Sequence, residues 1–406
     1  MLTVLLLLLF FAPTVQTRMS LGFVNLAFME PLVLVVSALM ILHQVYVRRT
    51  ITLPRNNFML FFAALLVWSI ILGLLSPNTR TGFNDIRAWV IPALGFIALL
   101  TVREDWTYWI KIYVISIAAN SLLGIIQYWT NSFRFFVPAE LSYQAARTAV
   151  IVVAGKATLV QLPFAAGLFG HANGYGLYLL GGLMVMLGYA LATKTLWARV
   201  MTVLTGLALI LSFSKTSIIM MVVLLAAFVI SRQNRERKIR IYFYLLGFAV
   251  FGLAAAVFLV KYLPPEIFTT LDWRVGLWRI ALNTIGKNPL ILIAGNGMDL
   301  FGDAAYWPQP HSLYVFFLLQ YGLPGLLLLL AVFLNTIHSG FSMVSRLVSG
   351  EKFLIIGVWL SILVYALIGF TESSLFSIED RMIFLTHIAF FIGLSREFKN
   401  KGILLI

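Results

Sequence analysis

The stretch that decides the fold runs from Leu271 to Leu330 and reads LDWRVGLWRIALNTIGKNPL, ILIAGNGMDLFGDAAYWPQP and HSLYVFFLLQYGLPGLLLLL in turn. It begins with an amphipathic segment that carries Arg274 and Arg279. It continues through a region rich in Pro and Gly, and it ends in a long apolar run that His311 precedes. Polar chemistry is denser here than elsewhere in the chain. We therefore expect the rest of the sequence to form a scaffold that holds this stretch.

Composition identifies that scaffold as a membrane protein. Of the 406 residues, 61% are hydrophobic and 11% are charged, whereas a soluble domain carries roughly 25% charged residues. The net charge of +14 would suggest nucleic acid as the partner of a soluble protein. In a membrane protein, retention of Lys and Arg on the cytoplasmic side explains much of it, so we expect no nucleic-acid partner. Because cysteine is absent, a disulfide framework and a thiolate metal site are excluded.

Apolar runs of the length needed to cross a bilayer predict an all-α polytopic protein with about twelve transmembrane helices. The first run resembles a signal peptide but lacks a basic segment before it, so we interpret it as a span. With no repeat or linker visible, residues 1–406 are predicted to form a single integral-membrane domain. The predicted spans are 2–16, 28–47, 57–76, 87–102, 106–127, 172–193, 198–213, 216–231, 241–260, 312–335, 353–370 and 379–395.

Basic clusters give the orientation of these spans. Residues 232–240 hold five cations in nine residues and should be cytoplasmic. Alternation of the spans then places both termini in the cytoplasm and turns two large loops outward, 128–171 and 261–311. The other clusters agree with this orientation: Arg48, Arg49, Arg55, Lys194, Arg199, Arg346, Lys352, Arg396, Lys399 and Lys401.

The outward side keeps more cations than a typical outward face does. An excess of positive charge there would attract an anionic, phosphorylated ligand carried by a lipid. Each cation could instead extend to lipid headgroups or pair locally. Cations on this side include Arg80, Arg87, Arg147, Lys156, Lys215, Lys261, Arg274, Arg279 and Lys287, and the acids near them are fewer: Asp85, Glu140, Glu266, Asp272, Asp299 and Asp303.

The first outward loop contains two apolar runs, 148–153 and 158–162, that are typical of strands or of a re-entrant segment. It ends in a glycine-rich segment, 167–176, that includes Asn173. Four glycines in ten residues permit the backbone to approach a ligand closely. Close packing against another helix would explain them equally well.

Arg274 and Arg279 lie five residues apart, roughly 140° around a helix, so both can flank one ligand. A guanidinium binds a planar oxyanion with two bonds and keeps its charge, which suits a lipid diphosphate. Anchoring at the membrane interface is the alternative. His311 follows Pro308-Gln-Pro310 at the start of an apolar helix. There the helix dipole favours a neutral imidazole, the form that accepts a proton.

These residues resemble a known family. His311-Ser312, nine residues, Gly322, two residues and Gly325 match the H-[NSQ]-x9-G-x-x-G signature of bacterial O-antigen ligases. Arg274, Trp278, Pro289 and Gly295-Asn-Gly297 resemble the outward loop of the wider O-antigen ligase/polymerase family. Gly167-Leu-Phe-Gly-His-Ala-Asn173 is similar to its glycine-phenylalanine-asparagine segment, and Ser212-Phe-Ser-Lys215 to its Ser-x-Ser-Arg segment. The resemblance covers roughly residues 160–330.

The resemblance implies an inverting, metal-independent glycosyltransferase without a cofactor, in the bacterial inner membrane and with a periplasmic active site. The donor would be a glycan on undecaprenyl diphosphate, and the acceptor lipid A-core or a second lipid-linked glycan. The catalytic residues would be His311, as the base or the group that orients the acceptor, and Arg274 and Arg279, which would stabilise the leaving diphosphate; Lys215 would help to bind it. The family often has Arg where this chain has Phe164, so the resemblance leaves that charge to Arg147 or Lys156, and Asn173 is a further candidate for substrate binding.

Alternatives remain at this point. The histidine signature favours a ligase, but a polymerase has the same scaffold. A transporter or flippase for lipid-linked sugars also fits about twelve spans and a basic cavity, although it should show charges in mid-membrane and an internal repeat. A non-catalytic assembly partner would tolerate loss of His311. Asp299 and Asp303 are four residues apart, and we do not expect them to bind a metal ion.

Overall fold

The computed structural model describes most of the chain, including all or most of every predicted span except 241–260. The described residues are 2–11, 18–21, 24–27, 29–48, 53–54, 56–101, 105–130, 146–153, 156–163, 165–169, 172–231, 269–295, 311–347, 350–372, 375 and 377–401.

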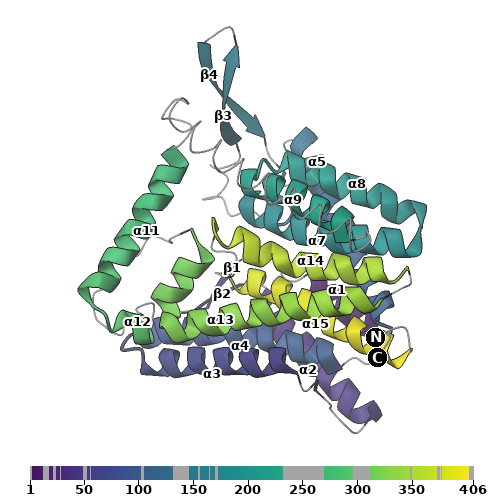
Figure 1. Ribbon diagram of the computed structural model, residues 1–406, viewed down its shortest axis with the longest axis horizontal. Helices are drawn as coiled ribbons and strands as arrows, with labels where there is room; N and C mark the ends of the chain where they lie inside the picture. Colours follow the sequence, from purple (N-terminus) through teal and green to yellow (C-terminus); the bar gives the residue numbers. More distant parts are fainter. Residues whose placement is uncertain are drawn as a thin grey trace.

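The described chain is a bundle of α-helices whose long members run side by side (Figure 1). Among the described residues, six helices are long and apolar enough to cross a membrane, namely α2, α3, α4, α5, α7 and α13, and three shorter ones are also apolar, namely α8, α9 and α14. The helices are α1 Leu2–Phe11, α2 Met29–Arg48, α3 Asn57–Leu75, α4 Thr79–Thr101, α5 Trp106–Thr130, α7 Ala172–Thr193, α8 Leu196–Leu211, α9 Lys215–Ser231, α11 Thr269–Lys287, α12 Ile291–Ala294, α13 Leu313–Arg346, α14 Lys352–Ile368 and α15 Ile378–Asn400.

The predicted all-α polytopic membrane fold is confirmed. Each predicted span other than 241–260 coincides with a described helix, and the total of about twelve stays a prediction. Helix α4 begins at Thr79, well before the predicted residue 87. Its polar first turns are stabilised inside the bundle, because Arg87 Nε lies 3.1 Å from Glu30 Oε2 of α2. For Arg87, local pairing is thus the correct interpretation.

Two short antiparallel hairpins accompany the helices. Strands β3 (Ala146–Val153) and β4 (Lys156–Pro163) pair in a register that runs from Ala146 opposite Pro163 to Val153 opposite Lys156. The two apolar runs of the first outward loop therefore form strands. Strands β1 (Arg18–Leu21) and β2 (Val24–Ala27) form a second hairpin. This hairpin was not predicted, because four-residue strands are too short to show a clear alternation.

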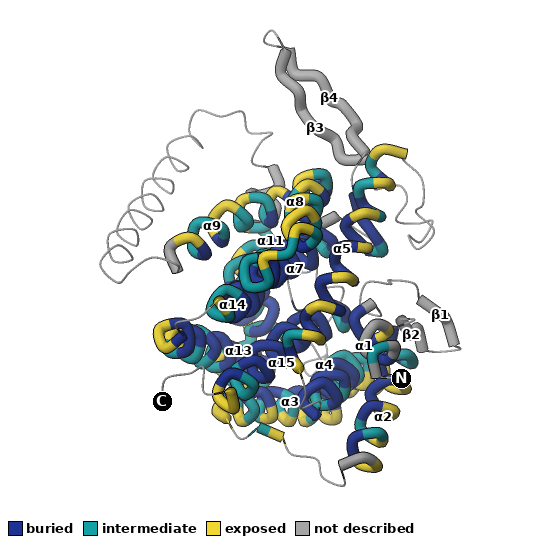
Figure 2. The backbone as a smooth tube through the Cα atoms, turned by 90° about the vertical axis from the view of Figure 1, so that its right-hand side faces the viewer, coloured by how far each residue is buried: buried dark blue, intermediate teal, exposed yellow. Residues whose placement is uncertain are grey.

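Small residues permit the closest helix packing. Gly188 of α7 and Gly357 of α14 face each other, and a Cβ at Gly357 would come within 2.4 Å of the Met184 carbonyl oxygen. Such contacts bring two backbones together without a side chain between them, as is common between membrane helices. Figure 2 shows α7, α14 and α15 as mainly buried, whereas α3 and α9 keep an exposed side. The core therefore lies around α7, α14 and α15.

Helix α13 is interrupted at Gly322, whose φ of 69° and ψ of −172° are not helical. The short helix α12 occupies the interruption: a Cβ at Gly322 would lie 2.6 Å from the Ile293 carbonyl oxygen, and one at Gly295 would lie 2.3 Å from the Gln320 carbonyl oxygen. The first glycine of the histidine signature therefore provides the backbone surface on which the segment after α11 docks.

We expect Gly322→Ala to destabilise the protein by at least about 1–3 kcal/mol, because this backbone region is nearly exclusive to glycine and the added methyl would collide with Ile293. Thermal unfolding in detergent measures the change. Gly206→Ala is the matched control, since nothing lies within 4 Å of a Cβ there, and it should be neutral or slightly stabilising. Equal unfolding temperatures for the two variants would contradict the docking role of Gly322.

Candidate active site

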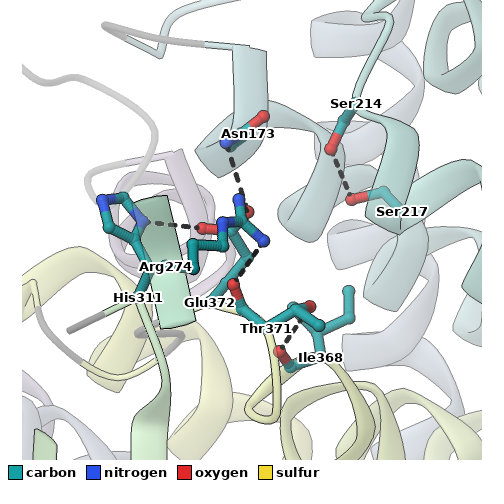
Figure 3. A network of polar contacts seen from close by, with 8 residues as sticks. All are labelled: Asn173, Ser214, Ser217, Arg274, His311, Ile368, Thr371 and Glu372. Atoms are coloured by element: carbon teal, nitrogen blue, oxygen red, sulfur yellow. Dashed lines mark hydrogen bonds and ion pairs between the residues drawn. The ribbon is translucent and has the colours of Figure 1, made fainter. Parts of the chain in front are cut away.

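Glu372 lies at the centre of a polar cluster to which three other elements contribute (Figure 3). Arg274 Nη2 of α11 is 2.6 Å from Glu372 Oε1. His311 Nδ1, just before α13, is 3.4 Å from Glu372 Oε2. Asn173 Nδ2, near the start of α7, donates to Glu372 Oε1 at 3.4 Å. One carboxylate thus joins three of the residues singled out from the sequence.

The turn after α14 is built to hold this carboxylate in place. The Glu372 amide donates to the Ile368 carbonyl at 2.9 Å, which closes the last turn of the helix. The Leu313 amide donates to the carbonyls of Gly369, at 2.7 Å, and Glu372, at 3.1 Å. These bonds satisfy an N–H at the start of α13 that has no partner within the helix. As a result, the start of α13 and the turn after α14 are tied together.

His311 has an unusual backbone conformation, with φ of 47°. A residue other than glycine rarely adopts this left-handed region unless its surroundings enforce it. Here the bonds of the Leu313 amide to the turn after α14 fix the direction of the chain just after His311. The imidazole is partly exposed and points to Glu372 (Figure 3). Backbone strain at a polar, accessible histidine agrees with a functional position.

Arg274 donates two hydrogen bonds to the same turn. Its Nη1 donates to the Thr371 carbonyl oxygen at 2.8 Å, while Nη2 binds the Glu372 carboxylate. Helix α11 itself lies obliquely across one end of the bundle and does not run along it (Figure 1). This is the arrangement that its amphipathic sequence predicts. The arginine is therefore held at the end of the bundle, beside His311.

The charge on Glu372 follows from these contacts. Burial raises the pKa of its carboxyl, but the hydrogen bond with His311 and the guanidinium of Arg274 outweigh burial, so the pKa is lowered from the ordinary value of 4.5. An ionised carboxylate only accepts hydrogen bonds. Nδ1 of His311 must then carry the proton of this contact, which leaves Nε2 as the proton-accepting nitrogen of the neutral ring.

We expect the stability contribution of Glu372 to depend on pH. Because its pKa is lowered in the folded protein, the contribution is present above about pH 4.5 and is lost as the pH falls through the lowered pKa. Glu372→Gln should therefore lower stability at pH 7 by about 1–3 kcal/mol, and this difference should vanish in strong acid. Thermal unfolding of both proteins across pH measures it. A difference that is absent at pH 7 or grows in acid would contradict the ion pair.

The other predicted site residues occupy different positions. Arg279 is exposed on α11 and makes no ion pair among the described residues. Lys215 is exposed at the first position of α9. It follows Ser214, whose hydroxyl donates to Ser217 at 2.9 Å near the Asn173 side chain (Figure 3). The backbone of Arg147 lies in β3 and that of Lys156 in β4, but the structure does not describe their side chains. Phe164, Asp299 and Asp303 also lie outside the described residues.

The glycine-rich segment before α7 packs against α5. Gly167 has φ of 59°, and a Cβ there would lie 2.2 Å from Asn120 Oδ1. Two buried amides of α5 hold the segment: Gln127 Nε2 donates to the Gly167 carbonyl at 2.6 Å, and Asn120 Oδ1 accepts from the Leu168 amide at 3.1 Å. For Gly167, helix packing is therefore the better of the two interpretations, and it places the start of α7 beside the cluster.

One family model matches the part of the chain that contributes most of these residues. Residues 200–330 match the family model described as O-antigen ligase. Residues 200–330 are thus similar to the O-antigen ligase family. Lys215, Arg274, Arg279 and His311 lie within this range, whereas Asn173 and Glu372 do not. No curated protein matches the chain. The resemblance identified from the sequence is confirmed over these residues.

The match to this family model supports a function of the O-antigen ligase or polymerase type in surface polysaccharide biosynthesis. It also implies lipid-linked glycans and membrane lipids as the molecules that the protein meets. Together with the apolar helices, it indicates a multi-pass membrane protein.

Glu372 was not among the residues predicted from the sequence. The predicted charged neighbours of His311 were arginines, whereas the structure places a carboxylate beside the imidazole and Arg274 on the other oxygen of that carboxylate. The available signal was the segment Thr371-Glu372-Ser-Ser, a polar group between the last two apolar runs. Its position on the outward side followed from the predicted alternation of the spans.

Proposed function

We propose that the protein is a glycosyltransferase that moves a glycan from undecaprenyl diphosphate to an acceptor hydroxyl on the periplasmic face of the inner membrane. The acceptor is lipid A-core for a ligase or a second lipid-linked glycan for a polymerase. The observation that carries this proposal is the Glu372 carboxylate, which joins the proton-accepting histidine to the arginine at 3.4 and 2.6 Å. Base and anion-binding group thus share one end of the bundle.

The diphosphate is the part of the donor that the cations recognise. The Arg274 guanidinium binds Glu372 and keeps its positive charge beside His311, and its buried Nε has no hydrogen-bond partner among the described residues. Arg279 and Lys215 are exposed and are proposed to meet the diphosphate when it arrives, with Arg147 or Lys156 as further candidates. Fixed cations stabilise the negative charge that develops on the leaving diphosphate.

The proton of the acceptor goes to His311. The acceptor oxygen attacks the anomeric carbon of the donor, and the bond from this carbon to the diphosphate oxygen breaks with inversion. Nε2 takes the hydroxyl proton as the new glycosidic bond forms. Glu372 accepts from Nδ1–H, holds the ring in that tautomer and balances the imidazolium, in the manner of the carboxylate in a catalytic triad. The products are the extended acceptor and undecaprenyl diphosphate, and no metal ion takes part.

The arrangement of the basic residues supports the periplasmic orientation. Arg48, Lys194 and Arg346 lie at or next to helix ends at the end of the bundle opposite His311 (Figure 1). Helix α15 carries Lys399 to that same end, where Glu397 accepts from the Trp106 amide at the start of α5 at 2.9 Å. Because Lys and Arg are retained in the cytoplasm, the candidate site then faces outward.

This function is tested by analysis of the surface polysaccharide made by a strain that lacks the gene. Long carrier-linked chains that are not joined to lipid A-core indicate a lost ligase, and a single repeat on lipid A-core indicates a lost polymerase. Complementation with the His311→Ala protein should leave either defect in place at unchanged protein level. Full complementation by this variant would contradict the transferase and would favour a transporter or a non-catalytic assembly partner.

A further inference from the structure

Beneath the candidate site, an acid, a phenol and a guanidinium from three helices meet inside the bundle. Asp85 of α4, Tyr321 of α13 and Arg381 of α15 are 9%, 0% and 2% exposed. The Tyr321 hydroxyl donates to Asp85 Oδ1 at 2.7 Å. Arg381 Nη2 donates to the Tyr321 oxygen at 3.2 Å and lies 3.9 Å from Asp85 Oδ1. The proposed reaction makes no direct use of these three residues.

The surroundings of the three side chains are closely fitted. The Arg381 guanidinium lies 4.3 Å from the ring centroid of Trp89, whose Nε1 donates to the Tyr321 hydroxyl at 2.8 Å. Replacing a buried ion pair by apolar residues of similar volume is often neutral or stabilising. A contribution to stability is therefore a weak explanation for this pair, and its contacts with other segments become informative.

One of these contacts reaches the turn that carries Glu372. Arg381 Nε donates to the Leu375 carbonyl oxygen at 2.9 Å. Leu375 follows Glu372 by three residues, in the same connection between α14 and α15. The Arg381 guanidinium therefore binds this connection at Leu375, while Arg274 binds it at Thr371 and Glu372.

A second contact reaches the segment that carries Arg274. Tyr321 directly precedes the interruption of α13, and its carbonyl oxygen, released from the helix ladder there, accepts from Trp68 Nε1 at 2.8 Å. Helix α12 docks on the interruption, where Gly295 approaches the carbonyl oxygen of Gln320. Helices α11 and α12 follow each other in the chain. The position of Tyr321 therefore determines where the segment that contains both helices is anchored.

We propose that Asp85, Tyr321 and Arg381 form a positioning cluster for the transfer reaction. The cluster fixes the Glu372 turn relative to the interruption of α13 and so sets the geometry of His311 and Arg274. The inference rests on the proposed function. None of the three side chains touches substrate, and their effect on the reaction passes through Glu372. A small displacement of positioned groups is enough to slow an enzymatic reaction strongly.

A double-mutant cycle between Tyr321→Phe and Glu372→Gln tests this inference. The purified proteins in liposomes are assayed for transfer from an undecaprenyl-diphosphate-linked glycan. Tyr321→Phe removes one hydroxyl and should lower kcat/KM about tenfold, equivalent to about 1.4 kcal/mol. In the Glu372→Gln background the same change should lower kcat/KM by less than about twofold. The effect of Tyr321 acts through the Glu372 carboxylate, which this background already lacks. Equal losses in both backgrounds, or no loss in either, would overturn the inference.

Tyr113→Phe is the matched control. Its hydroxyl is also buried, at 2.8 Å from His387 Nε2, but it lies among helices away from the Glu372 turn. It should leave transfer unchanged even if it lowers the unfolding temperature as much as Tyr321→Phe does. Should Tyr321→Phe fail to accumulate, Asp85→Asn enters the same cycle with the same two criteria. If Glu372→Gln and His311→Ala both keep full activity, the proposed function itself has failed. If only the cycle is additive, the positioning inference alone has failed.

Discussion

His311→Ala is expected to lower the rate of glycan transfer about 10²- to 10⁴-fold, the range of general acid–base catalysis by one positioned group. The reason is that Nε2 is the proposed proton acceptor, and Glu372, which also binds Arg274, keeps the ring in the accepting tautomer. The initial rate of transfer by the purified protein in liposomes measures the loss. Protein yield should not change, because the imidazole is partly exposed.

His338→Ala serves as the control for this substitution. It removes the same ring from the exposed surface of α13, far along the helix from His311, and should leave the rate unchanged. A rate for His311→Ala within about twofold of the wild type, where a lost general base should cost at least 10²-fold, would remove the base from the mechanism.

Arg274→Ala is expected to lower kcat/KM about 10²- to 10³-fold, as the removal of one fixed donor to developing charge does. It also leaves the carboxylate of Glu372 without the partner that lies 2.6 Å away. Arg274→Lys keeps the charge but cannot bind Thr371, Glu372 and a phosphate oxygen together, so it should recover only part of the activity. Titration of the donor in the liposome assay separates the effects on KM and kcat.

Lys287→Ala is the matched control for Arg274. It removes one positive charge from the same helix, at its exposed last residue, and should change kcat/KM little. Arg279→Ala should lie between the two, because Arg279 is exposed on the same helix and without an ion pair among the described residues. A loss for Lys287→Ala equal to that for Arg274→Ala would show that total charge, and not the position of Arg274, decides binding.

The membrane fold could be predicted from the sequence because the bilayer imposes a length and a composition on each span. The joint location of Arg274 and His311 could also be predicted, since both belong to one predicted outward loop. Arg279 shares that loop without reaching Glu372, because its helical phase turns it away from the turn after α14.

Contacts between distant spans could not be predicted in the same way. Glu372 lies 61 residues after His311, and their contact requires the start of α13 to bond to the end of α14. Arg381 and Asp85 lie in separate helices almost 300 residues apart in the sequence, and no pattern in either helix indicates that it contacts the other. The docking of α12 at Gly322 depends on two glycine backbones. The sequence motifs include both glycines, Gly295 and Gly322, but nothing in the motifs indicates that the two contact each other.

The most direct test is whether the purified protein, alone in vesicles with an undecaprenyl-diphosphate-linked glycan and an acceptor, releases undecaprenyl diphosphate in step with glycan transfer. Lipid A-core and a second lipid-linked glycan are supplied separately as acceptors. We predict equal amounts of released carrier and extended acceptor with one of the two, and neither product with the His311→Ala protein. Equal production by this variant, or no transfer by the wild type with either acceptor, would contradict the assignment of catalysis to the His311, Glu372 and Arg274 cluster.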